Sequence, residues 1–340
     1  MLIMEISNFK IIGSWIDYLK RENIAQALIG ANKKTDVLTA IEKWQLLQRE
    51  ESFRIGLSLK DDGPMDVGVE YSAEAFMQAN GFDGLAGDRY NHFFKFYSKY
   101  SGSKGKFLLE LNDCETALDD FEIFFRYPVK RTDDLTDTLL SFKAMLRYSS
   151  KVSQLLMPGL RVVKGGGMLS KKSAPLKLFL GNKGIVYDFN TRFKPIENLV
   201  TALFSSARGK VFKKIPLLED LNFFNKLTCF DCLLEVEVLP NGLISPKMQV
   251  ELICFPRTLE GQHSMFVSAA YKSFAEFLRG NGLADERLGA VEKSCFGVNM
   301  GAPREDNTIE RFYSTVDHFH LCYDLGERKE ARVYLMGQRK

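Results

Sequence analysis

The sequence contains no hydrophobic run long enough to cross a bilayer, so we expect no membrane span. Its first residues, MLIMEISNFKIIGSW, lack the basic start, the long apolar stretch and the cleavage site of a signal peptide, so we expect a cytoplasmic protein. Neither sign of charge is in marked excess, because 46 basic and 43 acidic residues leave a net charge of +3. This balance gives no reason to expect a nucleic-acid partner.

Cysteine patterns and phosphate-binding loops are also scarce. The six cysteines are scattered, and Cys229 and Cys232 form a CxxC without a second pair or a nearby histidine cluster. A zinc or redox half-site is the alternative, but buried structural thiols fit this isolated pair better. The glycines at 165–167 precede Ser170 and two lysines in a spacing that does not match G-x-x-x-x-G-K-[ST]. We expect these glycines to form the bend of a hairpin.

Segments in which apolar and polar residues alternate occur as five close pairs, which predicts five antiparallel hairpins. The pairs are 53–60 with 66–72, 106–112 with 121–127, 159–165 with 176–181, 230–239 with 247–255, and 314–324 with 331–336. Helix-like segments lie at 14–29, 35–50, 73–100, 132–156, 193–207, 217–227, 264–281 and 284–294. This repeated helix–helix–strand–strand order predicts a single α+β domain spanning 1–340. We expect a closed ten-stranded antiparallel β-barrel with helices outside; the alternative is an open sheet with a solvated polar face.

Helices outside a barrel require the apolar face of each strand to point outward and the polar face to line the lumen. In 53–60, Phe53, Ile55 and Leu57 alternate with Arg54 and Ser58. The lumen-facing residues predicted in this way are Arg54, Lys60, Glu70, Glu110, Glu122, Arg126, Arg161, Lys177, Glu235, Glu237, Gln249, Glu251, His318, His320, Arg332 and Tyr334. Burying so many charges without water or a ligand is costly, so we infer a solvated binding chamber.

Three stretches carry a resemblance to a known family: GGMLSKKSAPLKLFLG, CFDCLLEVEVLPNGLISPKMQVELICF and EARVYLM. The first has a basic turn that leads into a strand with a lysine and then an aromatic residue, and the last has a basic residue two positions before a tyrosine. Together with these stretches, the order of helices and strands over most of the chain resembles that of the soluble aromatic prenyltransferases of the ABBA type. The cyanobactin-type peptide prenyltransferases are the most similar subgroup, in size and in the glutamate on 247–255.

The resemblance implies a transferase of secondary metabolism that moves an isoprenyl group from an allylic diphosphate, dimethylallyl or geranyl, to an aromatic acceptor. The acceptor would be an amino-acid side chain in a peptide or a small aromatic molecule, and both substrates would bind inside the barrel. The resemblance leaves Mg²⁺ open as a companion of the diphosphate and implies no redox cofactor. The alternative function is a non-catalytic peptide- or ligand-binding barrel in a peptide-modifying system.

Prenyl transfer requires basic groups for the diphosphate, aromatic faces for the allylic cation and a base for the acceptor proton. The residues assigned to the diphosphate are Arg54, Arg126, Lys177 and Arg332, with Arg161 and Lys164 behind them. Those assigned to shielding the cation or binding the acceptor are Phe179, Tyr334, His318 and His320. Glu70 is the expected base, and Glu235 and Glu251 are the alternatives.

Several features limit these assignments. Some members of the family carry an arginine on the strand where this chain has Gln249 and Glu251, so the completeness of the diphosphate site is open. His318 and His320 lie on one face of a strand, but no third ligand is evident in the sequence, and we predict no metal site. The stretch DDLTD at 133–137 is interpreted as the capped start of a helix.

Overall fold

The computed structural model describes Trp15 and residues 52–60, 66–72, 106–111, 121–126, 160–167, 174–182, 193–208, 215–241, 243–299 and 311–339. Its strands are β1 (Ser52–Ser58), β2 (Asp66–Ser72), β3 (Lys106–Leu111), β4 (Phe121–Arg126), β5 (Leu160–Gly167), β6 (Leu176–Asn182), β7 (Phe230–Val238), β8 (Ile244–Cys254), β9 (Phe296–Asn299), β10 (Arg311–Asp324) and β11 (Glu327–Arg339). Its helices are α7 (Lys194–Arg208), α8 (Pro216–Phe224), α9 (Leu259–Val267), α10 (Ala269–Gly280) and α11 (Arg287–Val291), followed by a 3-10 turn at Glu292–Ser294.

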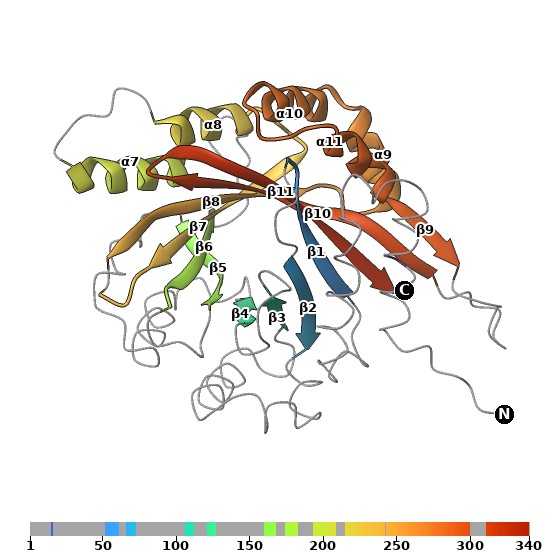
Figure 1. Ribbon diagram of the computed structural model, residues 1–340, viewed down its shortest axis with the longest axis horizontal. Helices are drawn as coiled ribbons and strands as arrows, with labels where there is room; N and C mark the ends of the chain where they lie inside the picture. Colours follow the sequence, from blue (N-terminus) through green and yellow to red (C-terminus); the bar gives the residue numbers. More distant parts are fainter. Residues whose placement is uncertain are drawn as a thin grey trace.

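The strands form one antiparallel sheet in the order β11-β1-β2-β3-β4-β5-β6-β7-β8-β10-β9. An additional pairing joins β10 to β11, so the sheet curls back on itself into a barrel-like form (Figure 1). Strands near the two ends of the sequence therefore lie side by side, with Phe53 of β1 opposite Gly337 of β11. The α+β class and the curled antiparallel sheet confirm the expected fold in outline.

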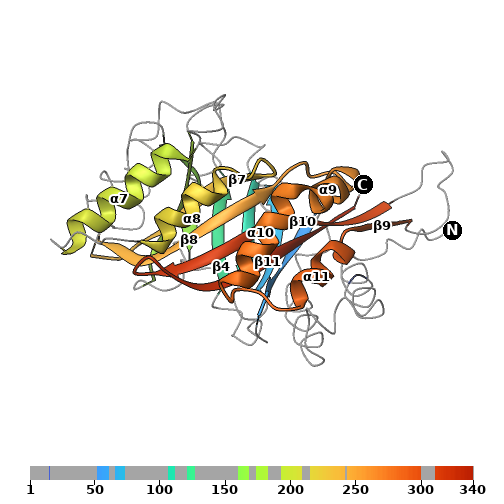
Figure 2. The ribbon, with the colours of Figure 1, turned by 90° about the horizontal axis from the view of Figure 1, so that it is seen from above.

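The apolar face of the sheet packs against the helices. Figures 1 and 2 show α7, α8, α9 and α10 on one side of the sheet, over β7, β8, β10 and β11. Phe274 of α10 contacts Phe230 and Phe319 of the sheet, with ring centroids 4.8 and 5.1 Å apart. The alternating residues Ile55 and Leu57 of β1 belong to the same buried core. The period-two pattern thus places the helices outside and leaves the polar face for the interior.

Local signals explain where the helices begin. Pro216 occupies the first turn of α8, where its missing N–H costs no helical hydrogen bond. The hydroxyl of Thr258 accepts a hydrogen bond from the N–H of Gly261 at the start of α9. The hydroxyl of Ser268 does the same for Tyr271 at the start of α10. This second cap divides the single helix expected at 264–281 into two.

A buried polar contact ties α8 to the hairpin of β10 and β11. Asp220 of α8 accepts hydrogen bonds from the hydroxyl of Tyr323 at 2.8 Å and from Nε of Arg328 at 2.7 Å. The second carboxylate oxygen accepts from Nη2 of Arg328 at 2.6 Å, so the arginine is held by both oxygens. Such bidentate pairs fix orientation as well as distance. This contact therefore links the helix to the long hairpin.

Strands lie at all ten of the segments predicted as strands. The short strand β9, which pairs with the first residues of β10, was not expected, because four residues give little periodic signal. The glycines at 165–167 belong to β5 and pair with β4 and β6, so the prediction that they form the bend was wrong. The helices expected at 35–50, 73–100 and 132–156 lie outside the described residues, as does 14–29 apart from Trp15.

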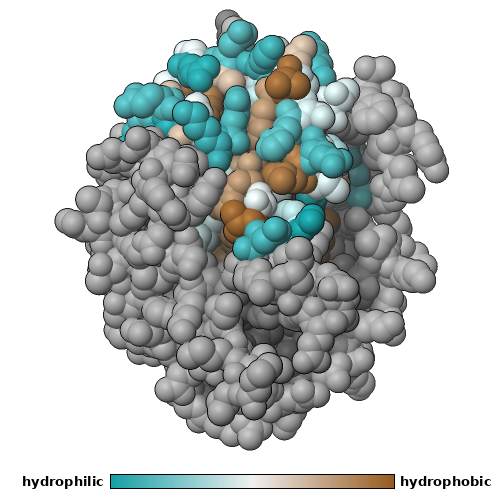
Figure 3. Space-filling model, turned by 90° about the vertical axis from the view of Figure 1, so that its right-hand side faces the viewer, coloured by the Kyte–Doolittle hydropathy of each residue, from teal (hydrophilic) through white to brown (hydrophobic). Residues whose placement is uncertain are grey.

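Two further observations concern the surface. Among the described residues, no helix is both long enough and apolar enough to cross a membrane. From the side on which β9 lies, hydrophobic residues are interspersed with hydrophilic ones (Figure 3). Within the described ranges, the exposed large hydrophobic residues are Leu243, Phe255, Val267 and Leu325, which come from separate segments. Single exposed apolar residues of this kind are normal for protein surfaces.

Candidate active site

A cavity of about 320 Å³ lies on the polar side of the curled sheet. Every strand except β9 contributes to it. The charged residues that line it are Arg54, Asp66, Glu110, Glu122, Lys164, Lys177, Glu235, Glu237, Lys247, Glu330 and Arg332. The remaining lining residues are Gly68, Leu108, Phe124, Phe179, Gln249, His318, His320, Cys322 and Tyr334. A cavity of this size that combines aromatic faces with converging charges is suited to a small ligand.

Lys177 of β6 forms an ion pair with Glu122 of β4, with Nζ 2.8 Å from Oε2. The two strands are not neighbours, because β5 runs between them. Gly166 of β5 lies opposite Lys177 on one side and opposite Phe124 on the other. With no side chain at this glycine, the lysine can reach across the strand. Burial alone lowers the pKa of Lys177, but Glu122 and Glu235 outweigh burial and hold that pKa above its ordinary value.

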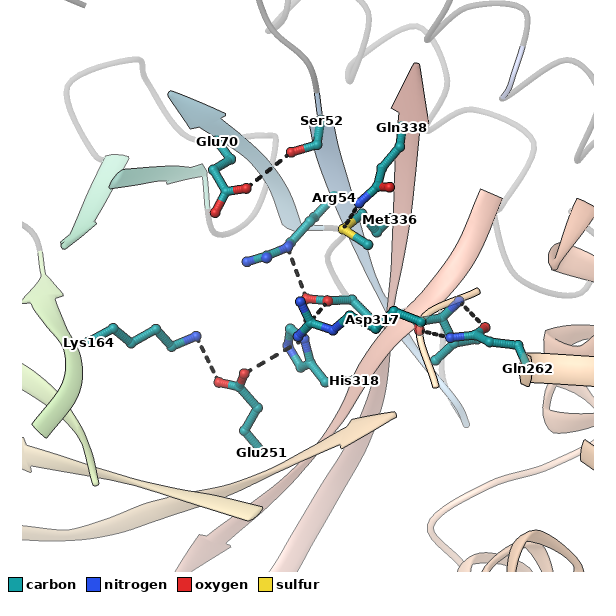
Figure 4. A network of polar contacts seen from close by, with 12 residues as sticks. Ser52, Arg54, Glu70, Lys164, Glu251, Gln262, Asp317, His318, Met336 and Gln338 are labelled. Atoms are coloured by element: carbon teal, nitrogen blue, oxygen red, sulfur yellow. Dashed lines mark hydrogen bonds and ion pairs between the residues drawn. The ribbon is translucent and has the colours of Figure 1, made fainter. Parts of the chain in front are cut away.

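Lys164 of β5 connects an aromatic surface to a carboxylate. Its Nζ lies 2.7 Å from Oε2 of Glu251 and 3.9 Å from the centroid of the Phe179 ring (Figure 4 shows the ion pair). Phe124 meets Phe179 edge to face at 5.4 Å. Burial raises the pKa of Glu251, but Lys164 and His318 outweigh burial and hold that pKa well below its ordinary value. The carboxylate is therefore ionised and the lysine lies over a ring face, a favourable position for a cation.

Arg54 of β1 is held by Asp317 of β10, with Nε 3.0 Å from Oδ2 (Figure 4). Nδ1 of His318 lies 2.9 Å from the same oxygen, and Arg257 contacts the other oxygen at 3.1 Å. A β-bulge between Val316 and His318 adds one residue to β10, which brings Asp317 beside His318. Burial raises the pKa of Asp317, but Arg54 and His318 outweigh burial and keep that pKa low.

Arg332 and Tyr334 of β11 both bind Asp66 of β2. Nη1 of Arg332 lies 2.6 Å from Oδ2 of Asp66, and the hydroxyl of Tyr334 donates a 2.8 Å hydrogen bond to the same oxygen. The Tyr334 ring stacks on His318, with centroids 4.4 Å apart and an angle of 16° between the planes. Burial and the charge of Asp66 raise the pKa of Tyr334, so the phenol stays protonated. The tyrosine and the two histidines form an aromatic wall beside Arg332.

Two lining carboxyl groups have pKa values near neutrality. Burial, together with the charges of Asp66 and Glu122, raises the pKa of Glu110 to about 8. Burial also raises the pKa of Glu235 to about 7, although Lys177 opposes the shift. Gln249 donates a 3.3 Å hydrogen bond to Oε1 of Glu235. The histidines shift the other way, because burial lowers the pKa of His318 and lowers that of His320 to about 3. Neutral imidazoles and easily protonated carboxyls therefore share one cavity.

The structure brings most of the predicted site residues together. Those that line the cavity are Arg54, Lys177, Arg332, Phe179, Tyr334, His318 and His320. Glu70, the expected base, is not among the lining residues; its Oε2 accepts a 3.3 Å hydrogen bond from Ser52. Lys60, expected in the lumen, is exposed. The side chains of Arg126 and Arg161 lie outside the described residues, so their assignments stay predictions, as do the roles of the other residues.

Sequence reasoning missed several polar residues of this region. Asp66 shares a face with Gly68 and Glu70, so extending the alternation by one position would have found it. Under simple alternation Asp317 would lie on the core face, opposite to His318. The β-bulge places it on the same face as His318. Lys247 is the first residue of the strand predicted at 247–255, and Glu330 precedes the strand predicted at 331–336, so alternation gave little indication of where their side chains point. Gln249, Glu251 and Lys164 were all named from the sequence, but nothing in the sequence indicates that Lys164 contacts Glu251.

This architecture is also found in solved structures of other proteins. No protein-family model matches the chain, and no curated protein matches its sequence. Among solved structures, the prenyltransferase PriB in its apo form matches with a TM-score of 0.56 and 10% identity, over 97% of this chain and 95% of PriB. A 6-dimethylallyl tryptophan synthase matches with a TM-score of 0.54 and 10% identity, over the same shares of the two chains. This chain has the fold of the aromatic prenyltransferases.

A third solved structure is also similar. It is 6-dimethylallyltryptophan synthase from Micromonospora olivasterospora, solved in complex with DMASPP and Trp, with 12% identity and a TM-score of 0.49 over 83% of this chain and 81% of that one. At these identities the likeness establishes the prenyltransferase fold alone. The chemistry of this chain has to be argued from its own cavity.

Proposed function

We propose that this protein is an aromatic prenyltransferase built as a single ten-stranded barrel of the ABBA type. It would move an isoprenyl group from an allylic diphosphate to an aromatic acceptor. The observation that carries the proposal is the convergence of arginine, lysine and aromatic side chains on one cavity in a fold shared with PriB. The pairing of β1 with β11 supports a single domain, because it joins distant parts of the sequence in one sheet.

The diphosphate would bind to the cations that line the cavity. Lys177, Arg332 and Arg54 come from three different strands and face the same space, as diphosphate binding requires. Each is already paired with a carboxylate, so the diphosphate must take the place of that carboxylate or bind beside it. Arginine and lysine provide donors for this exchange, since phosphate oxygens accept the same charge-assisted hydrogen bonds as carboxylates.

The transfer step follows from the aromatic lining. The bond between the allylic carbon and the diphosphate oxygen breaks, and its electron pair leaves with the diphosphate. Faces of Tyr334, Phe179 and Phe124 would then stabilise the allylic cation and exclude water from it. A carbon or heteroatom of the acceptor forms the new bond to the allylic carbon. The neutral imidazoles of His318 and His320, which line the same cavity, would bind the acceptor.

The acceptor must then lose a proton. Glu235 is a better candidate base than Glu70, because Glu235 lines the cavity and has a pKa of about 7. A base with a pKa near neutrality combines a useful ionised fraction with effective proton uptake. Replacing Glu235 with Gln should lower kcat while leaving pyrophosphate affinity within a few-fold, measured by steady-state kinetics and calorimetry. Equal kcat in the variant and the wild type would rule out this role.

Mg²⁺ could accompany the diphosphate. Magnesium prefers carboxylate, phosphate and water oxygens, and Glu237 supplies a carboxylate to the cavity wall. When bound, the ion would neutralise part of the charge of the leaving diphosphate. Turnover measured in EDTA and again with added MgCl₂ tests this requirement. Undiminished activity in EDTA would exclude it.

The test of the proposed function is product formation. Purified full-length protein is incubated with dimethylallyl or geranyl diphosphate and with tryptophan, tyrosine-containing and tryptophan-containing peptides and small phenols. We expect at least one acceptor to gain the mass of one prenyl group, with release of pyrophosphate, and we expect Lys177→Met to reduce the rate. The absence of any prenylated product, together with no pyrophosphate binding by calorimetry, would refute the proposal.

A second candidate function follows from the charge pairing. The cations Arg54, Lys164, Lys177 and Arg332 each face a carboxylate. Glu110 lies close to two of these carboxylates, Asp66 and Glu122. A cavity neutralised in this way could hold a cationic peptide side chain without any transfer chemistry. Saturable binding of lysine- or arginine-containing peptides, without turnover of any allylic diphosphate, would favour this binding function over the enzyme.

A further inference from the structure

Two imidazoles and a carboxylate meet at the wall of the cavity. His318 and His320 project from the same side of β10, with ring centroids 4.6 Å apart. Glu251 of β8 lies directly opposite His320 in the sheet register. One ligand atom from each of the three residues lies within 4.8 Å of the other two, and all three residues are buried. The third ligand that the sequence did not reveal is therefore supplied by the neighbouring strand.

A second observation points to a ligand at this place. Nε2 of His320 is buried and has no hydrogen-bond partner among the residues that the structure describes. Oε2 of Glu251 lies 3.6 Å from this nitrogen, which is longer than a hydrogen bond. Buried polar nitrogens are nearly always satisfied, so an imidazole nitrogen left in this way calls for an unrecorded partner.

We propose that His318, His320 and Glu251 form a binding site for a divalent first-row transition metal ion, such as Zn²⁺ or Fe²⁺. Two imidazoles and one carboxylate are a ligand set that these ions use when they keep coordination positions open for other molecules. Both histidines also line the cavity, so the open positions would face it. Mg²⁺ is disfavoured here, because it prefers oxygen ligands.

The surroundings supply a supporting carboxylate. Oδ2 of Asp317 lies 2.9 Å from Nδ1 of His318 and also contacts Arg54 (Figure 4). Arg257 contacts the other carboxylate oxygen of Asp317. Metal-binding histidines usually make such a contact, which fixes the orientation of the ring. The two histidines come from one rigid strand and Glu251 from its paired neighbour, so small side-chain adjustments would bring the three ligand atoms to coordination distance.

Lys164 competes with the metal for Glu251. Its ammonium lies 2.7 Å from Oε2 of Glu251, the oxygen that lies 3.6 Å from Nε2 of His320. A divalent ion bound to this oxygen would displace the ammonium, and repulsion between the two cations opposes simultaneous occupancy of the carboxylate. Removal of the ammonium should therefore strengthen metal binding. A merely structural cluster of histidines makes no such prediction, so Lys164 provides the discriminating variant.

The experiment is a Co²⁺ titration of the full-length protein after removal of metals with a chelator. Visible absorption reports nitrogen and oxygen coordination, and Zn²⁺ is added to compete. We expect binding of one ion, weakened at least about tenfold in His320→Ala and in Glu251→Gln. We expect Lys164→Met to bind the ion several-fold more tightly than the wild type. Mg²⁺ should not displace Co²⁺ at equal concentration.

Two control variants separate this site from others. His263, whose ring contacts the carbonyl of Cys295, lies apart from the cluster, so His263→Ala should bind Co²⁺ as the wild type does. Cys232→Ser tests binding by the CxxC, which would also produce a thiolate charge-transfer band. Melting curves establish that each variant is folded.

Anomalous diffraction from wild-type crystals grown with Zn²⁺ tests the same site without any substitution. A peak between His318, His320 and Glu251 is expected. The proposal would be overturned if the protein bound no ion, or if His320→Ala left binding unaffected. It would also be overturned if Lys164→Met bound the ion more weakly, or if the crystal showed no peak at this place. The outcome is independent of prenyl transfer, because metal binding is measured without substrates.

Discussion

The hydroxyl of Tyr334 on β11 donates a 2.8 Å hydrogen bond to Asp66 on β2, across the strand that separates them. That strand is β1, and Gly56 lies opposite Tyr334 on one side and opposite Asp66 on the other. A Cβ at Gly56 would lie 2.6 Å from the tyrosine ring and 3.1 Å from the carboxylate. A glycine in the intervening strand therefore permits a polar contact between strands that are not neighbours.

Gly56→Ala should disrupt this contact. Because the added methyl would overlap the ring of Tyr334, we expect a loss of about 1–3 kcal/mol in the free energy of unfolding, measured in urea. Gly289→Ala on α11 is the matched control, since nothing lies within 4 Å of a Cβ at that glycine, and its stability should be unchanged or slightly raised. Equal stability of the two variants would contradict the account of Gly56.

Lys177 and Glu122 offer a test of the proposed diphosphate site. Lys177→Met should weaken pyrophosphate binding at least about tenfold, because it removes a buried charge-assisted donor. Glu122→Gln should strengthen binding, since the lysine would no longer be shared with a carboxylate. Isothermal titration calorimetry measures both. The double variant controls for the unpaired buried charge that each single change leaves, and tighter binding in Lys177→Met would contradict the assignment.

The raised pKa of Glu110 predicts a pH-dependent stability. The ordinary value is 4.5 and the folded value about 8, so the favourable contribution of the protonated carboxyl is lost as pH rises from about 4.5 to about 8. The groups that face it are Asp66 on β2, Glu122 on β4, Lys164 on β5 and Lys177 on β6. Burial and the two acids raise the pKa, and the lysines offset only part of the shift.

Glu110→Gln should therefore be more stable than the wild type at pH 9, and the difference should be smaller at pH 6. One pKa unit corresponds to about 1.4 kcal/mol, so we expect the difference to change by at least about 1 kcal/mol between these pH values. Urea unfolding of both proteins at each pH gives the comparison, in which other titrating groups cancel. A difference that does not vary with pH would show that Glu110 titrates normally.

Asp220 should matter for stability and not for the cavity. Asp220→Ala leaves Arg328 without its bidentate partner and Tyr323 without its acceptor. We expect a loss of about 3 kcal/mol in the free energy of unfolding, in the range found when one partner of a buried ion pair is removed. Pyrophosphate affinity at low temperature should stay within about twofold of the wild type. A large loss of affinity in the folded variant would mean that this contact also shapes the cavity.

Much of the fold could be predicted because strand periodicity is simple. Alternation in segments such as 53–60 assigns each side chain to one face, and the positions of the helices decide which face is buried. Arg54 and Arg332 were found in this way. Caps are local signals too, yet the division of α9 from α10 at Ser268 was missed, because the hydrophobic pattern continues past it.

Several contacts of the cavity could not be predicted, because they join strands that are not adjacent in the sheet. Nothing local indicates that Lys177 reaches Glu122 over Gly166, or that Tyr334 reaches Asp66 over Gly56. The bulge at Asp317 interrupts the alternation from which each side chain was assigned to one face of the sheet. Glu70 has the correct parity, but it lies far enough along β2 to contact Ser52 in place of the cavity. Alternation predicts the face on which a side chain lies, but it does not predict how far along the barrel the residue lies.

The most direct test of the central claim, that this cavity holds an allylic diphosphate, is a crystal structure with dimethylallyl S-thiolodiphosphate. We predict that the diphosphate binds inside the cavity in contact with Lys177 and Arg332, with its prenyl chain against Tyr334 or Phe179. The carboxylates of Glu122 and Asp66 should then have turned away from their cations. An analogue bound elsewhere, or a cavity that stays free of it at saturating concentration, would contradict the account.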